Sequence, residues 1–339
     1  MKPRLDIQFP LCRQIQYWCG EEYIPKDGEY LVNHARTGIV MALRAALPKG
    51  GRVGVVAYNC HTVANAVVNA GSVPFFVDVT GDLRIDVESV SVDLDAIVVT
   101  NLFGIRNDVE AIRKRCPGAI IIVDNAHGYG LPVEGDFTVY SINQGKFPAL
   151  GEGGLLYAIE DFRFKIDDLY NELPSYGFIA QVNLFAQMMV KAVAYSRCMY
   201  WLTMKMKKKA NPDVHEKVVM KKMAPGVRRL YQAWLPKADE AIAAQKHNAE
   251  SIINLHGSAD RQKFEIINSQ YIIGSNAFMA IVKCDNPKEL KKKFAKRGVE
   301  TETHFKNAIT WAEQFGYKCG TCPKAEYLVE HLLMVPTYF

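Results

Sequence analysis

The feature that most constrains the fold is a regular alternation of short apolar runs and helical stretches between about residues 30 and 160. The runs are rich in β-branched residues, and AIIIV at 119–123 is apolar throughout, as in strands covered on both faces. Strand, helix and strand in this order predict a mostly parallel sheet with right-handed crossovers. The candidate strands are 52–57, 73–77, 95–100, 119–123, 137–141 and 154–158, and the candidate helices are 37–47, 61–71 and 108–116.

The rest of the chain predicts a second and smaller domain. Residues 161 to about 256 have mainly helical patterns, and the C-terminal part mixes strand and helix patterns. The C-terminal candidates are a strand at 277–283 and helices at 288–297 and 324–333. We therefore expect an α/β fold with a large domain over residues 1–256 and a small α+β domain over residues 257–339.

The composition excludes several classes of protein. Hydrophobic residues make up 49% and charged residues 23% of the chain, as in a globular protein. The eight Cys lack the spacing of a secreted disulfide scaffold, and charged residues rather than an apolar signal segment follow Met1. No apolar run is long enough to span a bilayer. These features predict a cytoplasmic protein, and the net charge of +5 gives no reason to expect nucleic-acid binding.

Three polar residues follow or end candidate strands and suggest one kind of chemistry. Asp124 follows AIIIV, Ser141 ends FTVYS, and Lys146 lies in the glycine-rich stretch SINQGKFPALGEGG. Each residue alone is more simply explained as a solvated loop residue. Together they match the needs of pyridoxal 5'-phosphate, which requires a lysine amine for a Schiff base and a carboxylate near its ring nitrogen. Its phosphate needs hydroxyls and N–H groups at a helix start, where Thr37 is expected.

Five segments of the chain resemble the DegT/StrS-type sugar aminotransferases, which are fold type I pyridoxal-phosphate enzymes. The most specific segment, GDFTVYSINQGKFPALGEGGLLY, is similar to the family's serine, four residues, lysine and GEGG. The other four are VDNAHGYG, GGRVGVVAYNCHTVANAVVNAGSVPFFVDV, ARTGIVMALRAAL and CPKAEYLVEHLLMVPTY. The resemblance runs from about residue 30 to the C-terminus, interrupted by an insertion at about 165–223.

The resemblance assigns roles to the residues at matching positions. It implies that Lys146 is the catalytic residue that forms the Schiff base and that Asp124 contacts the pyridine nitrogen. It also implies that Ser141 and Thr37 bind the cofactor phosphate.

Two more positions depart from the family's pattern. His127 stands where the family usually has a glutamine that hydrogen-bonds the ring hydroxyl. The family's ring-stacking aromatic aligns with Cys60, and His61 beside it would cover the ring after an adjustment of one residue; the alternative is that His61 is a core-packed or surface histidine. His304 and Lys306 stand where the family often contacts substrate, although a solvated strand end explains them equally well.

The function implied by the resemblance is transfer of an amine from an amino acid, in most relatives glutamate, to a keto-sugar linked to a nucleotide. A homodimer with active sites at the subunit boundary is implied as well. Two alternatives stay open: another pyridoxal-phosphate enzyme on the same scaffold, and a non-catalytic regulator that binds the cofactor. The CxxC at 319–322 stands before a helix pattern without a second Cys/His pair, so we predict no metal site.

The insertion is the part that the family does not explain. Between Ala186 and Met223 it carries nine Lys or Arg residues but only two acidic ones, Asp213 and Glu216. The simpler hypothesis is a helix packed against its own domain or a dimer mate. The alternative is an interfacial helix on anionic lipid, with its aromatic residues and lysines at the headgroups.

Overall fold

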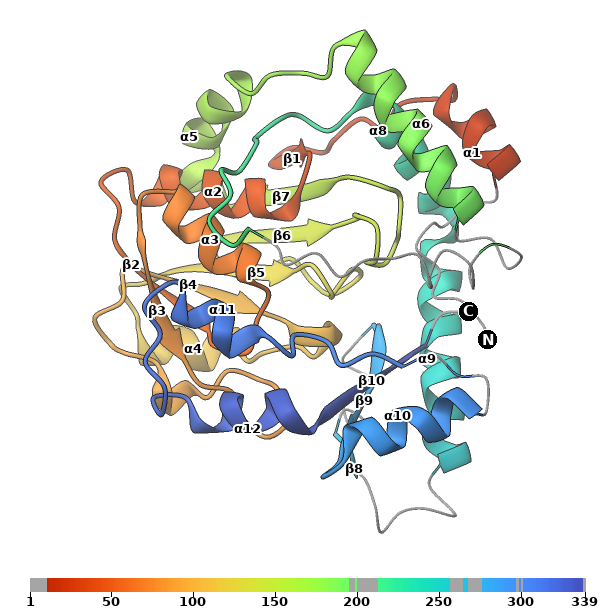
Figure 1. Cartoon of the computed structure of the whole chain (residues 1–339). Helices are drawn as coiled ribbons and strands as arrows, with labels where there is room; N and C mark the ends of the chain where they lie inside the picture. The colour runs from red at the N-terminus through yellow and green to blue at the C-terminus, as the bar shows by residue number, and fades with distance from the viewer. Residues whose placement is uncertain are drawn as a thin grey trace.

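The computed structural model describes residues 11–194, 199, 213–256, 265–267, 276–296, 299 and 301–337. A seven-stranded sheet with helices on both faces forms the larger part, and a three-stranded sheet lies beside it (Figure 1). The larger sheet has the order β1-β7-β6-β5-β4-β2-β3. Its strands are β1 (Glu29–Val32), β2 (Arg52–Val56), β3 (Val73–Val77), β4 (Ala96–Thr100), β5 (Ile120–Asn125), β6 (Phe137–Ser141) and β7 (Gly154–Ala158).

The predicted sheet is confirmed in its strands and in its mostly parallel order. Strands β3, β2, β4, β5 and β6 are parallel to one another, whereas β7 is antiparallel to both β6 and β1. The connection from β6 to β7 contains no crossover helix, which an antiparallel pair does not need. Strand β1 was not predicted, because its four residues EYLV are all buried and show no alternation.

The apolar runs form strands because both faces of the sheet are covered. Ile97 and Val99 of β4 point into one apolar cluster, and Ala96 and Val98 point into the cluster on the opposite face. This alternation is the two-residue period of a strand. Helix α2 (Ala35–Ala46) covers the second face against β5, β6 and β7. Gly38 permits this approach, since a Cβ there would lie 2.9 Å from a methyl carbon of Val139.

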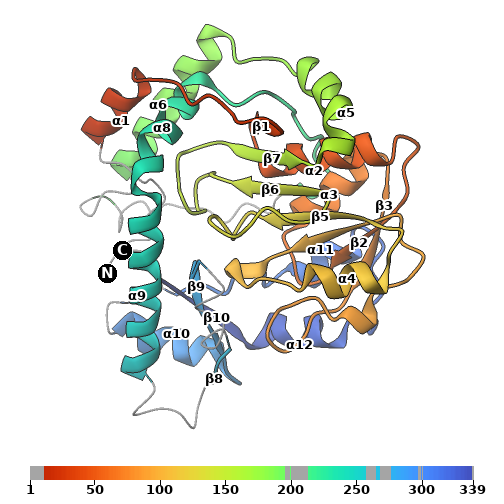
Figure 2. The same ribbon diagram turned by 180° about the vertical axis from the view of Figure 1, so that it is seen from behind.

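The remaining helices of the large part surround this sheet. The α-helices are α1 (Leu11–Trp18), α3 (His61–Asn69), α4 (Val109–Arg115), α5 (Glu160–Asn171), α6 (Phe178–Ala194), α8 (Pro225–Trp234) and α9 (Ala238–His256). Short 3-10 turns are η1 (Val87–Ser89), η2 (Leu102–Gly104) and η3 (Leu235–Lys237). Helix α9 runs along one side of the molecule from α8 toward the smaller sheet in both views (Figure 2). In the described part of the chain, no helix has the length and apolar character that crossing a bilayer requires.

The C-terminal part contains the smaller antiparallel sheet, with the order β10-β9-β8. One face of this sheet packs Ala280, Val282 and Leu333 against Phe294. Its other face joins the core of the large sheet. The Asp78 carboxylate accepts the N–H groups of Lys324 and Ala325 in the first turn of α12. The elements are β8 (Glu265–Ile266), β9 (Met279–Lys283), α10 (Pro287–Lys296), α11 (Ala308–Glu313), α12 (Pro323–His331) and β10 (Leu332–Pro336). The division of the chain at residue 256 stays a prediction.

Candidate active site

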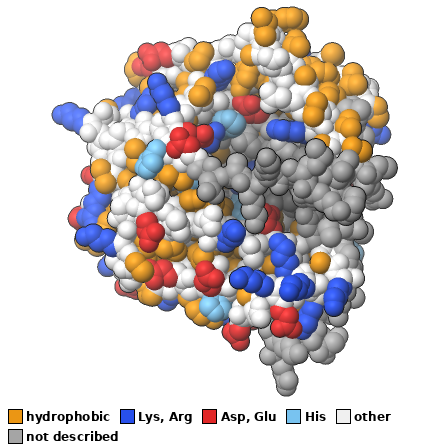
Figure 3. Space-filling model, viewed as in Figure 1, with side chains coloured by type: hydrophobic (Ala, Val, Ile, Leu, Met, Phe, Trp, Pro, Cys, Tyr) orange, Lys and Arg blue, Asp and Glu red, His pale blue; other side chains and the backbone are white. Residues whose placement is uncertain are grey.

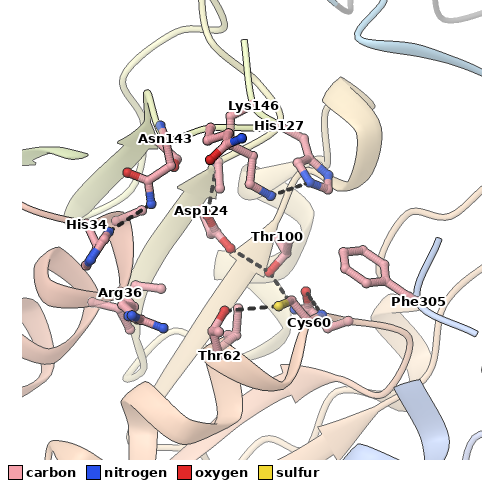
Figure 4. Close-up of a pocket in the computed structure, with 17 residues that line it drawn as sticks. His34, Arg36, Cys60, Thr62, Thr100, Asp124, His127, Asn143, Lys146 and Phe305 are labelled. Carbon is pink, nitrogen blue, oxygen red and sulfur yellow. Dashed lines mark hydrogen bonds between the residues drawn. The ribbon is translucent and has the colours of Figure 1, made fainter. Parts of the chain in front are cut away.

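A cavity of about 230 Å³ lies at the carboxyl ends of the parallel strands, where ligands of open α/β sheets bind. We call it the sheet-edge cavity. Its wall comes from the ends of β4, β5 and β6, the loop after β2, the loop between β6 and β7, and the starts of α2 and α3 (Figure 4). Phe305 from the C-terminal part completes the wall.

Asp124 near the end of β5 is the buried acid of this cavity, only 3% exposed. Its carboxylate accepts the N–H of Ala126 at 3.0 Å and the hydroxyl of Thr100 at 3.3 Å. The amide of Asn59 donates to the same hydroxyl oxygen of Thr100 at 2.9 Å and so orients it. Burial raises the pKa of Asp124, although the Ala126 N–H and the charge of Lys146 oppose this shift. A cation inside the cavity would therefore stabilise the ionised carboxylate.

Lys146 and His127 face each other across the upper part of the cavity. The Nζ of Lys146 lies 2.7 Å from Nε2 of His127 (Figure 4). Nδ1 of His127 accepts the backbone N–H of Phe103 at 3.2 Å, so the proton of a neutral imidazole is on Nε2. The rings of Phe278 and Phe103 stack on the imidazole at centroid distances of 5.0 and 5.3 Å. His127 is thus a fixed N–H donor that points into the cavity.

The start of α2 is on the opposite side of the cavity from His127. Ser141 lines the cavity there, as predicted from its place at the end of β6. Thr37 does not line it, because its fully buried hydroxyl donates to Asn33 at 2.8 Å. Arg36 lines it instead, and its guanidinium bonds Glu216 at 2.9 Å. The Nε of Arg36 is buried and has no hydrogen-bond partner.

Cys60 and His61 lie on different sides of the local backbone. Cys60 lines the sheet-edge cavity, whereas His61 contacts Trp311 edge-on at a centroid distance of 4.9 Å and is not part of the wall. This geometry opposes the hypothesis that His61 covers a cofactor ring. Burial alone would raise the pKa of the Cys60 thiol, but the neighbouring His61, the charge of Lys146 and the hydrogen bond from the Thr62 hydroxyl lower it to about 7.

The structure therefore brings five of the seven predicted site residues to one cavity and leaves Thr37 and His61 outside it. The five are Lys146, Asp124, Ser141, His127 and Cys60. Their individual roles stay predictions. His304 and Lys306 do not line the cavity either, although Phe305 between them does.

Sequence analysis missed several lining residues. Thr100 and Asn59 follow or end predicted parallel strands, so the rule that located Asp124 would have found them too. Prediction of Arg36 and His34 as lining residues would have required the true start of α2. Prediction of Asn143 would have required the path of the loop after β6. Phe305 reaches the cavity from a distant part of the chain and has no local sequence signal.

A second cavity of about 250 Å³ adjoins the first, and we call it the α6 cavity. The two share the residues His34, Asn143 and Gln144. Gly151 and Glu152 add to its wall, and α6 contributes the rest with Leu184, Gln187, Met188 and Lys191. The insertion that the family resemblance does not explain is thus next to the candidate active site.

Metal chemistry has no support in the described residues. They contain no group of three or more His, Cys, Asp or Glu side chains that would hold an ion. In the CxxC, Cys319 is exposed and Cys322 is buried, and both are free thiols.

The fold and the site together define an α/β enzyme with a lysine and a buried carboxylate at the carboxyl edge of its sheet. The sequence model of the DegT/DnrJ/EryC1/StrS aminotransferase family matches residues 22–339. The chain belongs to this family. This confirms both the resemblance and the predicted class of enzyme, an aminotransferase.

Solved structures confirm the predicted fold class. CalS13, a sugar aminotransferase from Micromonospora echinospora, matches with a TM-score of 0.73 at 15% identity, over 100% of this chain and 94% of CalS13. Spr1654 from Streptococcus pneumoniae, in its PLP form, matches with a TM-score of 0.72 at 14% identity, over 96% and 91% of the two chains.

A third solved structure was determined with a sugar product. DesI, in the presence of its TDP-sugar product, matches with a TM-score of 0.68 at 19% identity, over 91% of this chain and 75% of DesI. No curated protein sequence matches the chain.

Proposed function

We propose that this protein is a pyridoxal-phosphate-dependent aminotransferase that moves an amine from glutamate to a keto-sugar carried on a nucleotide. The observation that carries the proposal is the juxtaposition of Lys146 with the buried Asp124 in one cavity of an aminotransferase-family chain. CalS13 is a sugar aminotransferase and DesI has a TDP-sugar product, which supports the sugar and the nucleotide. The donor and the homodimer rest on the family resemblance.

The residues present fit this cofactor. The buried Asp124 would hold the ring nitrogen in its protonated form, and that cation would offset the burial that raises the pKa of Asp124. The amine of Lys146 would bind the aldehyde carbon, and the Nε2 proton of His127 would bond the ring hydroxyl. When bound, the cofactor supplies an electron sink for the substrate carbon that loses a proton.

The chain's own residues then move the proton. Displaced by the amino donor, the Lys146 amine is a general base within reach of the donor's α-carbon. Its Nζ would take the proton from the donor's α-carbon and hold it within the cavity for return in the next half of the transfer. His127 lies 2.7 Å from Nζ and keeps the amine directed into the cavity. Asp124 and the Thr100 hydroxyl keep the ring nitrogen charged throughout.

The remaining part of the cofactor is its phosphate, and its position follows from the ring substituents. The hydroxyl and the phosphate arm flank the aldehyde on opposite sides of the pyridine ring. With the hydroxyl held by His127, the phosphate would be held on the opposite wall, at the start of α2, where Arg36 lies (Figure 4). Ser141 also lines the cavity and offers a hydroxyl. The unbonded N–H groups of a first helical turn favour an anion there. We therefore propose that Arg36, rather than Thr37, binds the phosphate.

Arg36→Met is expected to weaken cofactor binding by about 10-fold or more, because a charge-assisted hydrogen bond is lost. The measurement is a titration of apoprotein with pyridoxal phosphate, followed by visible absorbance. Arg44→Met is the matched control, since Arg44 is exposed near the other end of α2 and bonds the carbonyl of Asn69. Equal cofactor affinity in the parent and in Arg36→Met would exclude Arg36 from the phosphate site.

The test of the proposed function is amine transfer itself. Addition of glutamate to the holoenzyme should bleach the visible absorbance of the lysine-bound cofactor and release 2-oxoglutarate. A protein that binds the cofactor but transfers no amine from glutamate or other amino acids would instead be the non-catalytic regulator.

Helix α6 also bears on the cellular location of this activity. One side of it packs on the large domain, where Phe185 contacts Trp18 at a ring centroid distance of 5.0 Å. Its outer face is an exposed apolar stripe, visible over α6 in Figure 3. The stripe contains Phe178, Ile179, Val182, Val190 and Val193. The lysine cluster at 205–209 lies outside the described residues. We propose a cytoplasmic enzyme that contacts anionic membranes reversibly through this stripe.

Replacement of Ile179 and Val190 by Gln is expected to reduce binding to anionic vesicles severalfold, because both side chains are at least 69% exposed in the stripe. Co-sedimentation with vesicles of phosphatidylglycerol and phosphatidylcholine measures this, with pure phosphatidylcholine as the neutral comparison. Val92→Gln is the control, since Val92 is 64% exposed outside α6. If the parent protein does not bind anionic vesicles at low salt, the membrane proposal is wrong, and packing of the stripe against a dimer mate becomes the explanation.

A further inference from the structure

The α6 cavity is built by one face of α6. Its four α6 residues, Leu184, Gln187, Met188 and Lys191, are spaced at i, i+3, i+4 and i+7, which places them on one side of a helix. The apolar stripe is on another side of the same helix. Met188 is 2% exposed and packs so tightly on the loop after β6 that a Cβ at Gly151 would lie 2.8 Å from its sulfur. This contact holds α6 in place over the cavity.

The polar groups that face this cavity have unused bonding capacity. In the part of the chain that the structure describes, the side chains of Lys191, Gln187 and Gln144 make no hydrogen bond or ion pair. The one acidic wall residue differs, because Glu152 accepts the hydroxyl of Tyr176. The cavity therefore offers a free ammonium and two free amides, which suit an anion and the hydroxyls of a sugar.

The border between the two cavities is polar as well. Asn143 bonds His34 at 2.9 Å, and it also accepts the N–H of Gly153 at 2.6 Å, so the border residues are fixed. Burial lowers the pKa of His34, which makes it a neutral neighbour of Lys191 near pH 7. Lys191 is then the cationic group of the α6 cavity wall.

We propose that the α6 cavity binds the phosphorylated part of the sugar substrate, and that Lys191 of the insertion determines this specificity by binding a phosphoryl oxygen. This inference rests on the proposed function. The α6 cavity, at about 250 Å³, is as large as the sheet-edge cavity at about 230 Å³, so it suits a bulky substrate group. The amino donor would react beside Lys146 in the sheet-edge cavity, and its short side chain needs no second cavity.

The test compares nucleoside diphosphate binding to the holoenzyme in four proteins, the parent and three variants. Calorimetry with UDP, dTDP and GDP should show at least one ligand that binds the parent and binds Lys191→Met about 10-fold or more weakly. Gln187→Leu should reduce the affinity for the same ligand by a smaller factor. Lys165→Met is the control, because Lys165 is exposed on α5 and is not in the wall of either cavity.

Two outcomes would overturn this inference: no binding of any diphosphate to the parent, and unchanged diphosphate binding in Lys191→Met. In the second case, a rise in the KM for glutamate in Lys191→Met would assign Lys191 to the donor carboxylate. Failure of the proposed function looks different, because it would be seen as no cofactor absorbance or no amine transfer in the parent itself.

Discussion

Lys146→Ala is expected to abolish amine transfer, with a fall in rate of about 10³-fold or more, because the same amine is the covalent anchor and the general base. The purified variant should lack the visible absorbance of a lysine-bound cofactor. Borohydride treatment followed by peptide mass analysis should place the reduced adduct on Lys146 in the parent and on no lysine in the variant. Quantification of 2-oxoglutarate after addition of glutamate measures the loss of activity.

Two controls make this result specific. Lys146→Arg keeps a long basic side chain beside His127 but offers no amine that reacts with an aldehyde, so it should fail in the same way. Lys165→Met should keep both the adduct and the activity, because it lies outside the cavity wall. A borohydride adduct on a different lysine, or undiminished transfer in Lys146→Ala, would refute the assignment.

Much of the fold follows from local sequence. The six predicted strands form because their apolar runs are covered on both faces, and this information is local to each run. Asp124 and Ser141 were found for the same reason, since the end of a parallel strand places a side chain at a known edge of the sheet. The chemical needs of pyridoxal phosphate, and then the resemblance to the family, connected Lys146 to them across a loop that local patterns do not define.

The structure differs from the sequence expectations where the helix starts decide the direction of a side chain. Consecutive residues of a helix point about 100° apart, so a shift of one position exchanges the residue that faces the cavity. Helix α2 begins at Ala35, two residues before the predicted start, and Arg36 rather than Thr37 lines the cavity. At the start of α3, Cys60 faces the cavity and His61 turns to Trp311.

The α6 cavity depends on tertiary packing that no local pattern contains. The sequence shows a helix with apolar residues on more than one side, and this is equally typical of burial and of an interface. Only the contact of Met188 with Gly151 shows which side faces the site. The insertion thus has two distinct faces, one toward the candidate active site and one toward the outside. Its sequence alone gave no means to separate them.

Asp124→Asn is expected to reduce turnover by about 10²-fold or more, because an amide cannot hold the ring nitrogen protonated and the electron sink is lost. Cofactor binding should suffer less, by about 1.5–3 kcal/mol, the usual contribution of a hydrogen bond to a charged group. Single-turnover kinetics with glutamate at saturating cofactor separate the two effects, and an absorbance titration gives the affinity. Cofactor supplied in excess should therefore not restore the rate.

The stability of the apoprotein provides a control on Asp124→Asn. Burial raises the folded-state pKa of Asp124 above its ordinary value, so this group stabilises the fold most at low pH, and the contribution is lost as pH rises through the raised pKa. The neutral amide has no such titration. The Tm of the apoprotein variant at pH 7 should therefore equal or exceed that of the parent, which shows that lost turnover is not lost folding. An Asp124→Asn holoenzyme with the turnover of the parent would contradict the role of this carboxylate.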